Sequence, residues 1–217
     1  MNNGYQIIKE NNKYSILLEK SNESLIKSIT KTKIILGPTI TDNYTVISFN
    51  ANNIQSWKEY YKAGQVSYNT YLKLIYYLSV QLKYLIETCN KAFIGYSPEH
   101  IIVINNERFM YLHVNQLHNI HNERINITYP FSPGEFYMSP EHLSIKEIPA
   151  NIHYKACYYS LACLIIDGYS NEKYDLNNMK NNINHKLELL PIKDTKLYYL
   201  LKRCISDNIK NRCILYI

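Results

Sequence analysis

Aspartate is nearly absent from the middle of this chain. Between Thr41 and Ile166 the sequence holds a single aspartate, Asp42. Enzymes that transfer phosphoryl groups use one aspartate to orient the acceptor hydroxyl and another to hold the metal, and Mg²⁺ prefers carboxylate and phosphate oxygens. This long stretch therefore cannot supply such a pair of aspartates.

The sequence also lacks a disulfide or zinc pattern, a membrane span or signal peptide, and a cluster of positive charge. The five cysteines are odd in number and show no C-x-x-C spacing, which favours reduced thiols in a cytoplasmic compartment over disulfides or zinc. No run approaches the ~18 consecutive apolar residues of a membrane span, and the polar start at Met1 lacks the apolar region of a signal peptide. The net charge of +6 comes from scattered lysines. We therefore expect a cytoplasmic protein with no nucleic-acid partner and no membrane.

The residues that are present indicate a folded chain. The 217 residues are 46% hydrophobic, which is enough for a buried core and argues against disorder. The 22 tyrosines, with abundant Asn, Ile and Lys, suggest an AT-rich genome such as that of a large DNA virus, a parasite or some bacteria. A viral chain would act in the host cytoplasm or in the virion. Tyrosine pairs such as Tyr60-Tyr61 are expected to pack at the edge of the core rather than to stack on a ligand.

The first fifty residues predict a small β-rich unit. Asn11-Asn12 is a turn signal between two apolar segments and predicts a hairpin. Pro38 and Asp42 mark turns farther along, and a polar connector follows at residues 50–53. The expected strands are residues 4–10, 13–19, 33–36 and 44–49.

The remaining residues predict mostly helices. Ser67 can cap a long helix, and Gly64 ends a shorter helix before it. Asn105-Asn106-Glu107 separates two apolar runs and predicts a second hairpin. The long helix places Tyr71, Leu74, Ile75, Leu78, Leu82 and Leu85 on one face. The expected helices are residues 54–63, the helix after Ser67, 155–167 and 197–204, with strands at 101–104 and 109–112 and short helices with loops over 171–191.

Four segments, in order, resemble the C-terminal lobe of a protein kinase. The strongest is Pro133–Glu141, PGEFYMSPE, which is similar to the G-T-x-x-Y-x-(A/S)-P-E end of an activation segment. Gly95–Val103 is similar to the catalytic loop D-x-K-P-E-N-I-L-V. Tyr158–Leu164 is similar to the D-V-Y-S-L-G-C-L start of the buried helix, and Leu201–Arg212 is similar to the ending L-x-R-C-L-x-x-D-P-x-x-R. The resemblance covers residues 67–217.

Carried over residue by residue, the resemblance implies a degenerate site. The catalytic aspartate position falls on Gly95, the phosphate-contacting lysine on Ser97, and the metal-binding asparagine on His100. The metal-binding D-F-G triplet falls near His113, where no acidic residue stands. The aspartate that holds the catalytic loop from the buried helix falls on Cys157.

By contrast, the resemblance implies that one structural pair is retained. Glu141 and Arg212 stand where kinases have a buried ion pair between the activation segment and the last helices. Loss of one partner of such a pair costs about 3–5 kcal/mol. We expect both residues to matter for the integrity of the fold.

The resemblance extends weakly into the amino-terminal part. Leu25–Ile29 resembles the V-A-I-K strand, which makes Lys27 the candidate nucleotide-contacting lysine; the alternative is an exposed strand lysine. About five residues separate it from the next expected strand, too few for a three-turn regulatory helix at 1.5 Å per residue. We therefore expect an α+β kinase-like fold with a reduced, β-rich small lobe (residues 1–50) that lacks the regulatory helix, and a mainly helical large lobe (residues 51–217).

Three functions are compatible with these features. The first is a pseudokinase that uses no ATP or metal cofactor and binds a protein partner, such as a kinase or a kinase regulator. The second is an unconventional ATP-dependent kinase in which Glu99, His100 or His113 replaces the lost groups. The third is a structural virion or assembly component. His118 and His121 could pair on a helix turn to hold a metal, but no acidic or thiol ligand stands nearby, so we expect surface histidines.

Overall fold

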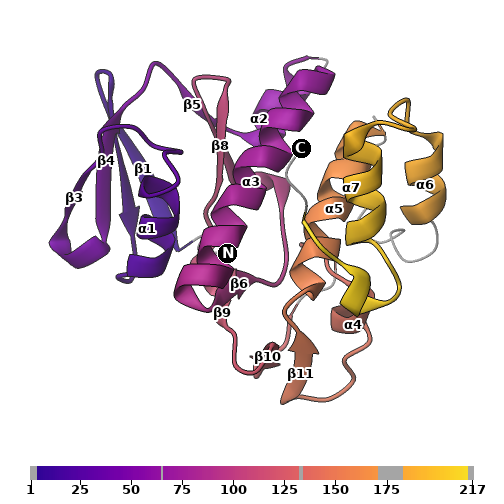
Figure 1. Ribbon diagram of the computed structural model, residues 1–217. Coiled ribbons are helices and arrows are strands. Elements are labelled where there is room, and N and C mark those ends of the chain that lie inside the picture. The colour runs from indigo at the N-terminus through magenta and orange to yellow at the C-terminus, as the bar shows by residue number, and fades with distance from the viewer. Residues whose placement is uncertain (1–3, 65, 132–133, 171–182, 215–217) are drawn as a thin grey trace. The chain divides into compact units, whose positions relative to one another are not determined.

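The computed structural model shows two compact units (Figure 1). It describes residues 4–64, 66–131, 134–170 and 183–214. Unit 1 comprises Met1–Lys91 with Pro98–Leu117, and unit 2 comprises Ala92–Ser97 with His118–Ile217. Helices and small antiparallel sheets both occur, so the expected α+β class is confirmed. Unit 1 extends well past residue 50; the division of the chain into kinase-like lobes at that residue stays a prediction.

Unit 1 begins with a four-stranded antiparallel sheet in the order β1-β2-β4-β3. Its strands are β1 (Tyr5–Glu10), β2 (Lys13–Leu18), β3 (Thr39–Thr41) and β4 (Val46–Asn50). The first hairpin turns at Asn11, whose φ of 56° suits asparagine, and this hairpin is confirmed. Ile16 pairs with Ile47 on the buried face of the sheet. The strand β3 was not expected.

A helix, α1 (Glu23–Thr30), stands where the sequence predicted the strand with Lys27. Asn22 caps it by accepting the N–H of Leu25 at 3.0 Å, and its apolar face packs on the long helix of the unit. The strand predicted at Leu25–Ile29 is therefore wrong, because these residues lie in a two-turn helix.

The strand expected at residues 33–36 is also absent. The N–H groups of Ile34 and Ile35 donate to the carbonyl of Ile29, and Lys33 has a φ of 59°. These bonds close the end of α1, so the segment is a helix terminus rather than a strand.

Two helices with side-chain caps form the middle of unit 1. The helix expected at residues 54–63 is split into β5 (Ile54–Ser56) and α2 (Trp57–Lys62). The split occurs because Ser56 and Glu59 form a capping box that fixes the first residue of the helix. Ser67 caps α3 (Tyr68–Cys89) as predicted, and the predicted apolar face of α3 is buried.

A second sheet packs against α3 in the order β5-β7-β8. The hairpin of β7 (Ile101–Ile104) and β8 (Arg108–Tyr111) is confirmed. Asn105 and Asn106 make its turn with φ values of 52° and 58°. The side chain of Asn105 also accepts the N–H groups of Asn52 and Asn53, at 2.7 and 3.2 Å, so the turn holds the connector of residues 50–53 in place. Two 3₁₀ turns, η2 (Pro98–His100) and η3 (Val114–Gln116), flank this hairpin.

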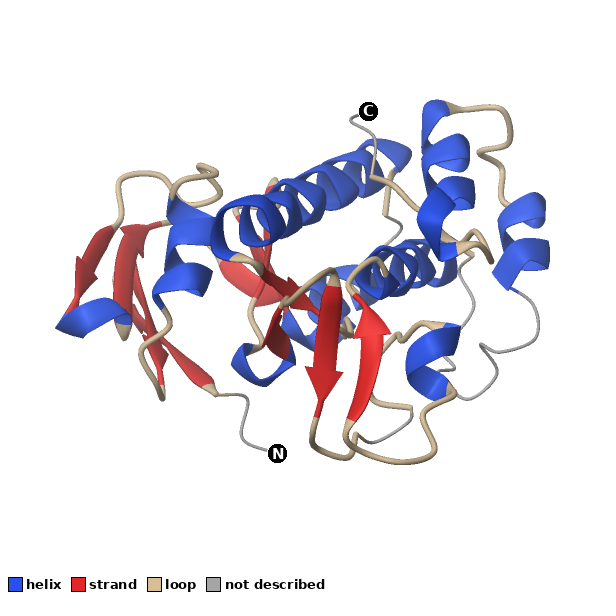
Figure 2. Cartoon of the chain, turned by 60° about the horizontal axis from the view of Figure 1, so that its bottom comes forward, coloured by secondary structure: helices blue, strands red, loops and turns tan. Residues whose placement is uncertain are grey.

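Unit 2 packs α6 and α7 against a central helix, α5. Its elements are β6 (Lys91–Phe93), β9 (Leu117–Asn119), β10 (Arg124–Ile127), α4 (Pro140–Leu143), β11 (Ala150–His153), α5 (Ala156–Tyr169), α6 (Ile183–Leu189), α7 (Lys196–Cys204) and η5 (Ile209–Asn211). β10 and β11 form an antiparallel pair (Figure 2). The helices predicted at 155–167 and 197–204 are confirmed. Of the segment 171–191, residues 171–182 lie outside the described residues.

The helices of the described residues do not include one long and apolar enough to cross a bilayer.

Candidate functional site

The first part of the loop that resembles a catalytic loop, up to Ser97, is fixed by hydrogen bonds within unit 2. The main chains of Tyr96 and Tyr137 form an antiparallel bridge with N to O distances of 3.2 and 2.7 Å. The hydroxyl of Ser160 on α5 donates to the carbonyl of Ile94 at 3.1 Å. Gly95 and Ser97 are buried between these contacts. This part of the loop is thus packed, and Gly95, which the resemblance places at the catalytic position, has no side chain.

A buried carboxylate in unit 2 anchors the segment around Tyr137. Asp167 on α5 accepts the Tyr137 hydroxyl at 2.8 Å and the Lys186 ammonium of α6 at 2.8 Å. Its side chain is 1% exposed, so the ion pair compensates a charge that would be costly to bury alone. The sequence reasoning missed this cluster. The available signal was a single acid at the end of an otherwise apolar buried helix, since such an acid requires a partner.

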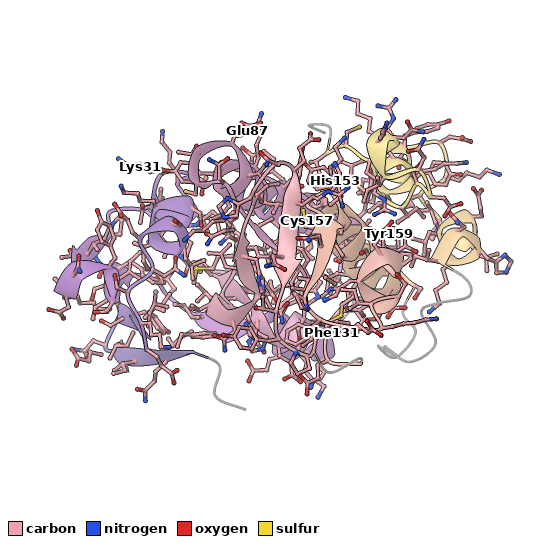
Figure 3. The ribbon with its side chains drawn as sticks, turned by 90° about the horizontal axis from the view of Figure 1, so that it is seen from below. Lys31, Glu87, Phe131, His153, Cys157 and Tyr159 are labelled. Atoms are coloured by element: carbon pink, nitrogen blue, oxygen red, sulfur yellow. The ribbon has the colours of Figure 1, made fainter. Side chains whose placement is uncertain are left out.

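The structure brings together Glu141 and Arg212, which the resemblance singles out as a structural pair. Two parallel hydrogen bonds join them, Nη1 to Oε2 at 3.0 Å and Nη2 to Oε1 at 2.6 Å. Arg212 is 1% exposed; its Nε donates to the Ser206 carbonyl at 2.8 Å and its guanidinium carbon lies 4.9 Å from the ring centre of Tyr159 (labelled in Figure 3).

The electrostatics of this pair agree with its geometry. Burial alone would raise the pKa of the Glu141 carboxyl, but the hydrogen bonds and charge of Arg212 outweigh burial and lower the pKa below its ordinary value. The carboxylate is therefore held in its charged form. A bidentate pair of this kind fixes both distance and direction, so it ties the start of α4 to the residues after η5.

In unit 1 His100 and His113, the two histidines that the resemblance places at metal-binding positions, lie against each other. The rings of His100 and His113 meet edge to face with centroids 4.3 Å apart, and each residue is 8% exposed. Burial lowers the pKa of His113 to about 4, with His100 as the second cause. Burial also lowers the pKa of His100, against the opposing effect of Glu99. Both imidazoles are therefore neutral at neutral pH.

Glu99, the other candidate substitute group, is an exposed carboxylate that is already paired. Its carboxylate forms an ion pair with Lys58 of α2, and its side chain is 58% exposed. The hydrogen bond from Lys58 lowers the pKa of Glu99. A carboxylate with a lowered pKa is a weaker base than an ordinary one.

Lys27 lies on α1 rather than on a strand. It pairs with Glu23 one turn earlier, and its ammonium lies 5.8 Å from the ring centre of Tyr44. The hydrogen bond to Glu23 raises the pKa of Lys27. Its contacts are those of an exposed lysine on a helix, so the strand position expected for Lys27 is wrong.

No part of the described chain gathers three or more His, Cys, Asp or Glu side chains in an arrangement suited to a metal ion. His118 lies in β9, and His121 forms an isolated bridge with Arg124, so the two histidines do not share a helix turn. His121 is exposed and His118 is half-buried. All five cysteines are free thiols, and burial raises the pKa of Cys204 to about 12.

No protein-family model and no curated protein matches this chain. The kinase resemblance therefore rests on the four segments themselves. Of the residues it assigns, Glu141 and Arg212 meet in the structure, whereas Gly95 and Ser97 belong to unit 2 and His100 and His113 to unit 1.

Proposed function

We propose that this chain is a catalytically inactive, kinase-like protein that acts by binding another protein. The observation that carries the proposal is a contrast within unit 2. The Glu141–Arg212 pair is complete, with both hydrogen bonds made, while the packed loop at Gly95 has no carboxylate to orient an acceptor. The features that preserve shape are kept and those that perform transfer are lost.

The lost groups account for most of the rate of phosphoryl transfer. A general base contributes about 10²–10⁴-fold, and the metal neutralises the charge that develops on the phosphoryl group. The substitutes at hand are two buried neutral imidazoles, His100 and His113, and a carboxylate, Glu99, already paired with Lys58. Imidazole nitrogen is a poor ligand for Mg²⁺. These contacts disfavour the unconventional enzyme.

The connector between β4 and β5 gives independent support. The N–H of Ala51 donates to the carbonyl of Asn12 at 3.0 Å, and those of Asn52 and Asn53 donate to Asn105. This connector stands where a kinase would have its hinge, and a nucleotide that needed these N–H groups as donors would first have to break the protein's own hydrogen bonds. Partner binding through protein surfaces has no such requirement, and a kinase or kinase regulator is the partner class that the kinase-like shape favours.

The test of inactivity is a thermal-shift titration of the purified chain with ATP, alone and with Mg²⁺ or Mn²⁺. A ligand that binds only the native state stabilises it by about 2.7 kcal/mol at a hundredfold excess over Kd, which is readily measured. We expect no shift in any of the three series. An active protein kinase in the same buffers is the positive control. A metal-dependent shift, followed by phosphate transfer to a protein substrate, would overturn the proposal.

The test of partner binding uses purified protein kinases on a biosensor surface. We expect the folded chain to bind at least one of them and to change its activity towards a peptide substrate. A chain that binds no kinase in the panel, and co-sediments instead with assembled particles, would favour the structural role.

A further inference from the structure

The paired histidines of unit 1 hold together three segments that are far apart in the sequence. His100 ends η2, His113 precedes η3, and the Tyr5 ring of β1 meets the His100 ring edge-on with centroids 6.3 Å apart. Gly4, just before β1, lies against Val114: a Cβ on Gly4 would be 3.7 Å from the Val114 Cβ. The start of the first strand is thus seated on the residues around the imidazole pair.

Main-chain hydrogen bonds depend on the same two residues. The carbonyl of His100 accepts the N–H of Leu112 at 2.9 Å, and the carbonyl of His113 accepts the N–H of Gln116 at 3.1 Å. The position of both histidine rings is therefore coupled to the end of β8 and to η3. Any force that separates the rings acts on these bonds.

Two imidazoles with centroids 4.3 Å apart can be neighbours only while at least one is neutral. Protonation of both would place two cations in contact in a site from which water is largely excluded, where repulsion between like charges is strong. We propose that the His100–His113 pair is an acid-sensitive latch, which holds Tyr5 against η2 and η3 when neutral and releases it when the pair becomes charged.

The other charged and titratable groups around the pair set the direction of this response. Glu99 on η2 favours a proton on His100, but the Lys58 ammonium of α2 neutralises that carboxylate. The Tyr5 phenol of β1 is uncharged at neutral pH, since burial raises its pKa to about 12. Burial and mutual repulsion lower the pKa of His113. The folded state therefore resists the proton that an unfolded or released segment accepts, so acid favours release.

The latch can be tested by amide hydrogen exchange at Leu112 and Gln116. The two N–H groups are followed at about pH 7.5, 5.5 and 4.5, a range that spans the charge change of ordinary histidine. After correction for the intrinsic rate, the wild type is expected to lose protection by about tenfold or more for each pH unit below 5.5, the response of a linked proton. The double variant His100→Gln/His113→Gln, which cannot take up a proton there, is expected to keep its protection.

Two matched controls separate the latch from general acid sensitivity. His142→Gln removes a buried histidine of unit 2, and His185→Gln removes an exposed one on α6. Both are expected to lose protection at Leu112 and Gln116 as the wild type does. If the double variant loses protection at the same pH as the wild type, the latch is wrong.

A second measurement covers the case in which the double variant does not fold at neutral pH. NMR titration of the wild-type imidazoles is expected to show His100 and His113 neutral below the ordinary histidine range and a shift of the Tyr5 ring resonances as they gain protons. Independent titration of both rings near their ordinary pKa, with Tyr5 unchanged, would overturn the proposal.

Discussion

The side chain of Gln81 pairs with the main chain of Tyr111 in the way that a residue of a neighbouring strand would. Its amide nitrogen donates to the Tyr111 carbonyl at 3.0 Å, and its amide oxygen accepts the Tyr111 N–H at 2.8 Å. Within the described residues β8 pairs with β7 alone. A side chain of α3 therefore makes the main-chain hydrogen bonds at the outer edge of β8, where Tyr111 is fully buried.

Replacing Gln81 with leucine should destabilise unit 1 strongly. The apolar side chain keeps most of the volume but removes both Gln81 hydrogen bonds to the buried Tyr111 main chain, and the loss of a hydrogen bond to a buried group costs about 1–3 kcal/mol. Urea unfolding measures the loss. Glu87→Ala, at an exposed position of the same helix (labelled in Figure 3), should leave the midpoint nearly unchanged. Equal stability of the wild type and Gln81→Leu would show that water can replace the amide.

Asn105 should be sensitive to the loss of its side-chain oxygen rather than to the loss of its amide. Its φ of 52° is tolerated by asparagine, aspartate and glycine. Asn105→Asp keeps the acceptor for the N–H groups of Asn52 and Asn53, whereas Asn105→Gly keeps only the backbone conformation. We expect the glycine variant to lose about 1–2 kcal/mol and the aspartate variant to stay near the wild type in thermal melts. If Asn105→Asp were less stable than Asn105→Gly, the backbone conformation at Asn105 would matter more than its side-chain oxygen.

Arg212→Ala should lower the stability of unit 2 by about 3–5 kcal/mol, because the half-buried Glu141 carboxylate loses both hydrogen bonds from Arg212 and its opposite charge. Calorimetry of the wild type and the variant measures the difference in melting temperature. Lys202→Ala, which breaks the exposed pair with Glu188 on α6, is the control and should melt with the wild type. An unchanged melting temperature for Arg212→Ala would show that the ion pair does not stabilise unit 2.

The elements that could be predicted from sequence are those whose signals are local. The helix α3 has its cap at Ser67 and a continuous apolar face, and the hairpin of β7 and β8 has asparagines at its turn. The segment Leu25–Ile29 carried no such unique signal, since its short apolar pattern fits a strand as well as a helix. Its state is decided by the Asn22 cap and by packing on α3, and the second of these is a contact between distant residues.

The same distinction holds for the polar clusters. Glu141 and Arg212 are 71 positions apart, and only the resemblance to kinases suggested that they meet. Asp167 and Gln81 are each a polar residue on a buried helix face, and a buried polar group requires a hydrogen-bond partner. The sequence does not say which partner, because Lys186 and Tyr111 are chosen by how the chain folds back on itself.

His142 should make unit 2 less stable in acid. It is fully buried against Phe131, with ring centroids 4.1 Å apart, and burial lowers its pKa to about 4, with His118 as a second cause. The unfolded chain takes up the proton at the ordinary histidine pKa, so stability falls as the pH drops from about 6.5 towards 4.

The variant His142→Gln removes this linked proton. Between about pH 7 and 4.5 it should lose about 2–3 kcal/mol less unfolding free energy than the wild type, measured by urea unfolding at each pH. His185→Gln, at an exposed position, should follow the wild type. Parallel curves for the wild type and His142→Gln would show that the buried imidazole accepts a proton without cost.

Gly95→Asp should not create a phosphotransferase. The new carboxylate would stand where the kinase resemblance places the catalytic base, but a base supplies only about 10²–10⁴-fold, and the metal ligands of that resemblance would still be missing. Gly95 is also buried beside the Tyr96–Tyr137 bridge, so an unpaired carboxylate there should lower the melting temperature. Gly95→Ala separates the effect of volume from that of charge and should melt above Gly95→Asp.

Transfer of labelled phosphate to a protein substrate is measured with Mg²⁺ and with Mn²⁺. Metal-dependent transfer by Gly95→Asp that Gly95→Ala lacks would mean that the remaining residues still bind the nucleotide and its metal, so the site would be less degraded than the resemblance implies.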